Sequence, residues 1–175
     1  GSGWFAARPH FEPEPKEYKM EFARVNPSRD AENLAAYHVE YDGELMFHEG
    51  DPIEMDFLGM DSAAGQRAGI RQAKRLSKIN KRGSKSTNIE DYDFDQIETR
   101  KRFVENSNAL FYADMLAGWR NVTHIPSGEE GGDIEMLKYT PESAIDLLKK
   151  AVWLHAGIDD FLANKSNWRQ DLKSG

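Results

Sequence analysis

The sequence predicts a mainly α-helical fold with a small N-terminal β element and an extended N-terminal arm. Helical periodicity dominates the second half of the chain, whereas strand-like alternation and a hairpin turn occur only within residues 18–60. Several prolines precede residues 18–60 and indicate the arm. The expected organisation is a tag scar at 1–3, an arm at 4–17, an α+β element at 18–60, a basic helix, mobile in the free protein, at 61–88, and a helical C-terminal unit at 89–175.

The N-terminal arm is indicated by three prolines within residues 9–15. Proline lacks an amide donor and biases the preceding residue towards extended backbone, so this stretch is not expected to be helical. The arm also carries aromatic side chains that are too apolar for a simple solvated tail. We expect them to dock on the body of the protein or, alternatively, on a partner. These side chains are Trp4, Phe5 and Phe11.

The α+β element begins with apolar and polar residues alternating over 18–25, which predicts a strand. Ser28 is expected to cap a short helix. Residues 39–47 then predict a hairpin, because Asp42-Gly43 is favoured where both turn residues need positive φ. The apolar positions of the short helix would be Ala31, Leu34, Ala35 and His38.

The basic segment, residues 62–85, holds eight lysines and arginines and no acid. A helix is predicted, but its apolar residues recur every three positions from Ile70 to Ile79. That spacing moves about 60° round the helix at each step, so no single face should be buried. Gly65 and Gly69 reduce helix propensity further. We predict a partner-binding surface at Arg71, Lys74, Arg75 and Lys78.

A long helix is expected over residues 95–119, ended by Gly118. Its apolar residues form a broad stripe that should face the core. The acids of residues 89–98 precede or begin this helix, so the basic segment could simply be a solvated face neutralised by them. The stripe consists of Phe103, Val104, Phe111, Met115 and Trp119.

The last third contains the clearest helix start, with Thr140 as cap and Pro141 at the first helical position. Gly157 is expected to break this helical region, and a short final helix follows. Ile158, Phe161 and Leu162 should face inward from it. The large core side chains expected in this unit are Trp119, Trp153 and Phe161.

Composition and motifs give no sign of catalysis. The chain has no cysteine, which excludes disulfides and thiol nucleophiles. Its five histidines are scattered, and only His48, Glu49 and Asp51 come close to a ligand set, with a spacing typical of no established metal site. No phosphate-binding loop and no G-x-S-x-G motif occur. We therefore expect no catalytic residue, no metal, no cofactor and no enzyme activity.

No apolar run is long enough for a membrane helix, so no membrane partner is expected. The net charge of −7 argues against nucleic-acid binding by the whole surface. The basic residues of 67–85 nevertheless leave an alternative, a nucleic-acid-binding accessory protein. Against it, the segment lacks the aromatic side chains on which single-stranded bases stack.

Three stretches of the last third carry a resemblance to a known family. They are Ala117-Gly118-Trp119-Arg120-Asn121-Val122, Tyr139-Thr140-Pro141-Glu142-Ser143-Ala144, and Val152-Trp153-Leu154 followed by Ile158 and Phe161. Together they resemble the C-terminal half of siphophage (lambda-like) tail assembly chaperones. Ser143 replaces an asparagine of that pattern. Val152 replaces a proline, which moves the expected helix break to Gly157.

The resemblance implies a cytosolic, non-enzymatic assembly factor. Such chaperones bind the tape measure protein and recruit tail tube subunits during tail assembly in the host cytoplasm, and they are absent from the mature virion. Many of their genes also give a longer product by frameshifting. Self-association is left open as a further interaction.

Overall fold

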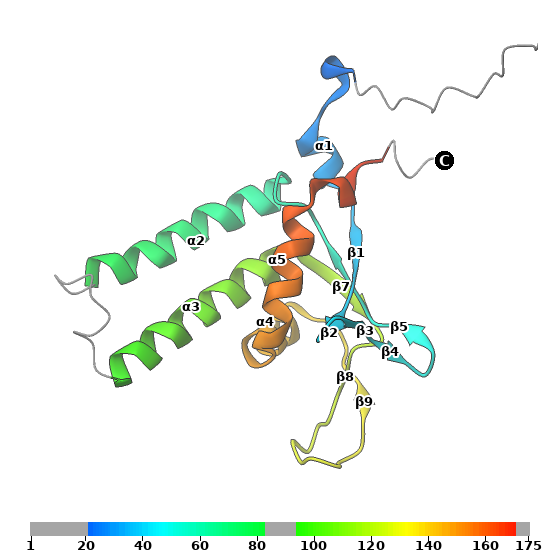
Figure 1. The fold of residues 1–175 in the computed structure, drawn as a ribbon, viewed down its shortest axis with the longest axis vertical. Helices are drawn as coiled ribbons and strands as arrows, with labels where there is room; N and C mark the ends of the chain where they lie inside the picture. Colours follow the sequence, from blue (N-terminus) through cyan, green and yellow to red (C-terminus); the bar gives the residue numbers. More distant parts are fainter. Residues whose placement is uncertain (1–20, 83–93, 171–175) are drawn as a thin grey trace, which may run out of the picture.

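A computed structural model describes residues 21–82 and 94–170 of the chain (Figure 1). Its centre is a three-stranded antiparallel sheet of β1 (Ala35–His38), β6 (Glu54–Phe57) and β7 (Leu116–Arg120), in the order β1-β6-β7. Helices pack against one face of this sheet, and three small hairpins extend from it. The sheet therefore joins strands from both halves of the chain.

The central strand β6 shows why the sheet has one buried face. Met55 and Phe57 are fully buried, whereas Glu54 and Asp56, one residue out of phase, point to the other side. On that outer side, Arg120 of β7 donates two hydrogen bonds to the Asp56 carboxylate, at 2.6 and 2.9 Å. The alternation and this ion pair hold the β6–β7 register.

The predicted hairpin turn at Asp42-Gly43 is confirmed, with φ of 52° and 79°. It joins β2 (Glu40–Tyr41) to β3 (Glu44–Leu45) as an antiparallel pair. Two further hairpins also consist of two short antiparallel strands each. They are β4 (Phe47–His48) with β5 (Asp51–Pro52), and β8 (Thr123–His124) with β9 (Glu135–Met136).

Five helices and three short 3-10 turns complete the described chain. The helices are α1 (Pro27–Ala31), α2 (Ala63–Arg82), α3 (Phe94–Met115), α4 (Pro141–Lys150) and α5 (His155–Ala163). The 3-10 turns are η1 (Phe22–Arg24), η3 (Val152–Leu154) and η4 (Lys165–Trp168). Helices α2 and α3 lie side by side as a long pair that extends away from the sheet (Figure 1).

The predicted start of α4 is confirmed in atomic detail. The Thr140 hydroxyl accepts a hydrogen bond from the Ser143 amide at 2.9 Å, and the Ser143 hydroxyl accepts one from the Thr140 amide at 2.8 Å. Pro141 occupies the first helical position. This reciprocal arrangement satisfies two backbone donors that the helix itself leaves free.

The core forms between the buried sheet face and helices α3, α4 and α5. Its largest fully buried side chains come from the sheet and from all three helices, which shows that sheet and helices share one core. They include Tyr112, Phe57, Met55, Met115, Leu148 and Ile158. Near α1, Trp168 closes the end of the core.

The prediction of a mainly α fold is wrong. The structure is 53% helical and 19% strand, with several small antiparallel sheets, so it is mixed α/β. The long helix expected to reach Trp119 ends at Met115, and residues 116–120 form β7. Pairing with β6 outweighs the local helical pattern here, because strand formation in a short segment depends on the neighbouring strand against which it packs.

The N-terminal part of the α+β element also differs from the prediction. Within the expected strand at 18–25, residues 22–24 form the 3-10 turn η1, and 18–20 lie outside the described residues. The expected short helix is capped by Asn26 rather than Ser28, because the Asn26 side chain accepts from the Arg29 amide. It ends at Ala31, and Ala35–His38 becomes β1 through its pairing with β6.

Two predictions about the buried faces of helices are wrong. Helix α2 does bury one face, because its least exposed positions recur at a spacing of three or four residues, from Gly65 and Ala68 to Gln72, Leu76 and Ile79. In α3 the expected stripe is displaced. Met115 is buried as expected, but Phe103 is 38% exposed, and Ser107, Ala109 and Tyr112 are buried outside the expected stripe.

The region after α4 breaks earlier than predicted. Helix α4 ends at Lys150, with Ala151 as its C-cap, η3 follows, and Gly157 lies inside α5. A Cβ at Gly157 would collide with the Tyr37 hydroxyl, so this glycine permits close packing. Ile158 and Leu162 face inward as expected, whereas Trp153 is 47% exposed and Trp119 and Phe161 are only partly buried.

Candidate protein-binding surfaces

The four basic residues singled out by sequence all lie on α2. At about 100° per residue, Arg71, Lys74, Arg75 and Lys78 fall within an arc of about 100° on the helix surface. We call these four residues the basic stripe. The stripe is offset from the buried face of α2, so the helix can pack with one side and present positive charge with another. Its lysines and Arg71 are exposed, and Arg75 is half-buried.

The two arginines of the basic stripe take part in the contact between α2 and α3. Arg71 forms an ion pair with Asp114 of α3, with Nη1 and Oδ1 3.4 Å apart. Arg75 donates two hydrogen bonds to the Gln72 side-chain oxygen, at 3.0 and 3.3 Å. The Gln72 amide in turn donates to Asn108 of α3 at 2.8 Å. These polar contacts hold α2 against α3.

The two lysines of the basic stripe are different. Lys74 and Lys78 are exposed, and neither has an ion-pair partner among the described residues. Their ammonium groups are therefore available to a partner. The structure thus separates the predicted site into two residues that support the helix pair and two that present free charge.

The aromatic residues predicted to bind a partner, Trp4, Phe5 and Phe11, lie outside the described residues. Their role stays a prediction. The acids of residues 89–93 also lie outside, so the proposed neutralisation of the basic segment is not tested by them.

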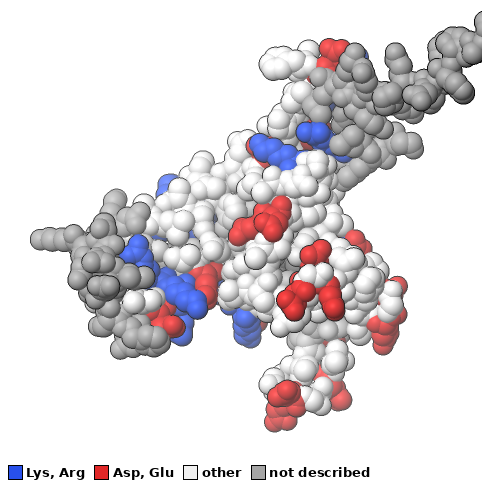
Figure 2. All heavy atoms as spheres, viewed as in Figure 1, with Lys and Arg blue, Asp and Glu red and all other residues white. Residues whose placement is uncertain are grey.

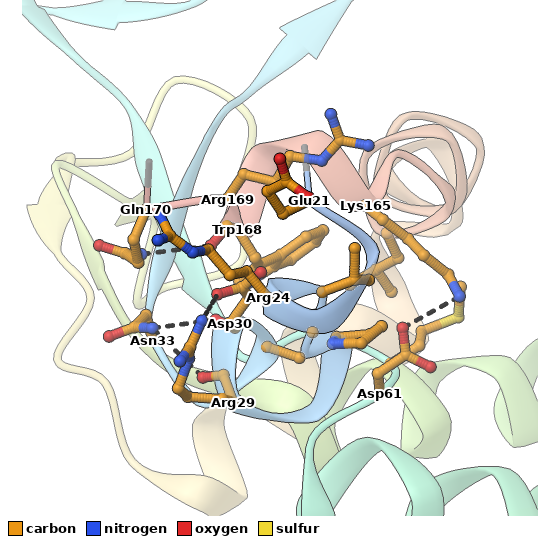
Figure 3. Close-up of a pocket in the computed structure, with 16 residues that line it drawn as sticks. Glu21, Arg24, Arg29, Asp30, Asn33, Asp61, Lys165, Trp168, Arg169 and Gln170 are labelled. Atoms are coloured by element: carbon orange, nitrogen blue, oxygen red, sulfur yellow. Dashed lines mark hydrogen bonds and ion pairs between the residues drawn. The ribbon is translucent and has the colours of Figure 1, made fainter. Parts of the chain in front are cut away.

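A pocket of about 680 Å³ lies between α1 and η4 (Figure 3). Its wall includes the buried Trp168 ring and the side chains of Ala31 and Met60. Charged residues of both signs surround it, and two of them pair, Lys165 with Asp61 at 3.0 Å. An apolar wall with a mixed charged rim suits a polypeptide segment, and no nucleophile–base pair is evident among its lining residues.

Buried polar residues between α3 and α5 have a structural role. The Tyr112 hydroxyl donates to the Asp159 carboxylate at 2.6 Å, and burial, reinforced by this bond, raises the pKa of the Tyr112 phenol. The ring of His155 packs on Tyr112 with centroids 5.0 Å apart, and its Nε2 lies 2.8 Å from the Leu148 carbonyl oxygen. His155 is therefore a buried packing residue.

Within residues 21–82 and 94–170, no group of three His, Asp or Glu side chains is arranged to hold a metal ion. His48 and Glu49 approach each other at 3.9 Å. No helix of the described chain is both long and apolar enough to cross a membrane.

Sequence reasoning missed an exposed aromatic pair. Tyr41 of β2 and Trp153 of η3 pack edge to face, with ring centroids 5.3 Å apart, and they are 59% and 47% exposed. Trp153 had been expected in the core. One signal was present in the sequence, because Tyr41 directly precedes the Asp42-Gly43 turn and side chains at a hairpin tip are seldom buried.

Comparison of the chain with models of protein families, with curated proteins and with solved structures found no match. The resemblance to tail assembly chaperones therefore stays a prediction.

Proposed function

We propose that this chain is a bacteriophage tail assembly chaperone, a non-enzymatic protein that binds the tape measure protein and recruits tail tube subunits in the host cytoplasm. In this proposal it leaves the assembled tail and is absent from the mature virion. The observation that carries the proposal is the basic stripe on α2, whose free lysines stand on a helix seated against α3. The resemblance in the last third of the sequence supplies the partner class.

The spacing of the two free lysines of the basic stripe suits pairing with a helical protein partner. Lys74 and Lys78 are one helical turn apart, about 6 Å along the axis. Acidic side chains on one face of a partner helix have the same spacing, so the charges can pair in register. Because the whole chain is acidic, with a net charge of −7, a local basic stripe also steers an acidic partner to one place on the surface.

Replacing Lys74 and Lys78 by glutamate tests this role. With a tape measure protein co-expressed from the same phage, we expect the wild-type chain to keep it soluble and Lys74→Glu/Lys78→Glu to lose that effect. The thermal unfolding of the variant itself should stay within about 0.5 kcal/mol of wild type, because exposed charges contribute little to folding. The measurement is the soluble fraction of the tape measure protein.

A matched control is Lys138→Glu/Lys149→Glu, which makes the same change in net charge at exposed lysines of other segments. It should leave the partner soluble. Arg71 and Arg75 are unsuitable for this test, because glutamate at Arg71 would face Asp114 and a change at Arg75 would disturb the Gln72–Asn108 contact. Normal activity of the Lys74/Lys78 variant would reject the basic stripe as the site.

The alternative, nucleic-acid binding, would use the same positive charges of α2. The dependence of affinity on salt concentration tests it. If the stripe and its neighbours neutralised several phosphates, affinity for DNA would fall about a thousandfold between low and moderate salt. We expect no binding to single- or double-stranded DNA even at low salt, since α2 carries no aromatic residue for base stacking. A salt-dependent complex lost in Lys74→Glu/Lys78→Glu would favour the alternative.

A further inference from the structure

We infer that the exposed pair Tyr41–Trp153 and the acids around it form a second docking surface, which binds a basic amphipathic helix of another protein. This inference does not depend on the chaperone proposal and concerns a different part of the molecule from the basic stripe. The surface, here named the aromatic–acidic patch, consists of Tyr41, Trp153, Glu40 and Glu44.

The aromatic pair has the properties of an interface anchor. Trp and Tyr are the residue types most often found at binding hot spots, and both rings here are about half exposed. Their edge-to-face contact, at an interplanar angle of 90°, already restricts the two side chains. A partner that covers them would therefore lose less side-chain entropy than one that must order free rings.

The backbone segments that carry Tyr41 and Trp153 are both held in place by the fold. Tyr41 lies in a hairpin strand directly before the positive-φ turn, and Trp153 lies in η3 between the buried residues Ala151 and Leu154. The hairpin and η3 also contact each other. Two elements distant in sequence thus hold one exposed aromatic surface in place.

The hairpin that carries Tyr41 also carries two exposed carboxylates, Glu40 and Glu44. Glu44 is the cross-strand partner of Tyr41, so the two side chains lie on the same face of the hairpin. Glu40 precedes Tyr41 and is exposed. Figure 2 shows carboxylates predominating at the lower right, where Figure 1 places the hairpins.

Exposed aromatic rings beside carboxylates favour a partner that carries both apolar and basic side chains. A lysine or arginine can lie over an aromatic face and pair with a neighbouring carboxylate, while leucine-type side chains cover the remaining ring surface. An amphipathic helix presents such apolar and basic residues in adjoining rows. Nucleic acids and anionic membranes do not fit, because their phosphates would meet Glu40 and Glu44.

The test uses a synthetic amphipathic helix of about 14 leucine and lysine residues as the probe, titrated into the full chain by calorimetry. We expect Tyr41→Ala/Trp153→Ala to weaken binding about tenfold or more. A second variant, Glu40→Lys/Glu44→Lys, keeps both rings and should weaken binding as strongly, with the loss smaller at high salt. A probe with glutamate in place of lysine should not bind.

The matched control is Ile134→Ala/Met136→Ala, which removes exposed apolar side chains at or beside β9. It should bind the probe like wild type, and so should Lys74→Glu/Lys78→Glu. Equal binding by wild type and both patch variants would overturn the inference. It would also be overturned if the free chain were a dimer that the patch variants dissociate, because the occupant would then be a second copy. Failure with the tape measure protein alone would reject only the proposed function.

Discussion

Replacing Trp168 by alanine should lower the free energy of unfolding by about 3–5 kcal/mol, the range for large aromatic residues removed from a core. Trp168 is 3% exposed, and its indole N–H donates to the Phe57 carbonyl at 3.0 Å. Its ring also packs on Phe161, with centroids 5.2 Å apart. The substitution leaves a cavity and one buried carbonyl without its partner. Urea unfolding followed by circular dichroism measures the loss.

The control for this prediction is Trp153→Ala, which removes the same side chain from a half-exposed position. We expect a loss of no more than about 1.5 kcal/mol, because little apolar surface is withdrawn from water there. A larger loss at Trp153 than at Trp168 would contradict the structure and restore the core position that sequence reasoning expected for Trp153.

Replacing Gly65 by alanine should also be strongly destabilising, by about 2 kcal/mol or more, although alanine is the better helix former. A Cβ at this position would lie 2.5 Å from the carbonyl oxygens of Gly59 and Met60. Both are backbone atoms and cannot rotate away. The Ser62 hydroxyl donates to the Gly59 carbonyl and accepts from the Gly65 amide, which fixes this turn at the start of α2.

Gly69→Ala, one helical turn further along α2, is the matched control. No atom lies within 4 Å of the Cβ it would add, so only the change in helix propensity remains. We expect it to stabilise the protein by about 0.5–1 kcal/mol. Thermal unfolding of the two variants should therefore shift in opposite directions, and a stabilising Gly65→Ala would show that α2 does not approach residues 59–60 closely.

Several features could be predicted because neighbouring residues decide them. The Asp42-Gly43 turn needs two positive φ angles, and the start of α4 needs the donors and acceptors of Thr140 and Ser143. Helix α2 was likewise expected from its composition. For the candidate site, the predicted residues lie on one side of α2, since charged side chains rarely occupy a core, and their role in binding a partner stays a prediction.

Neighbouring residues thus account for the turn, the capped helix and the positive charge of α2. Which segments become strands depends instead on tertiary contacts, because β1 and β7 exist through their ladders with β6. Tertiary contacts also decide that Arg71 supports the helix pair while Lys74 is free, and that Trp153 meets Tyr41 at the surface. The physical reason is that pairing and burial depend on contacts between distant residues, which no local pattern records.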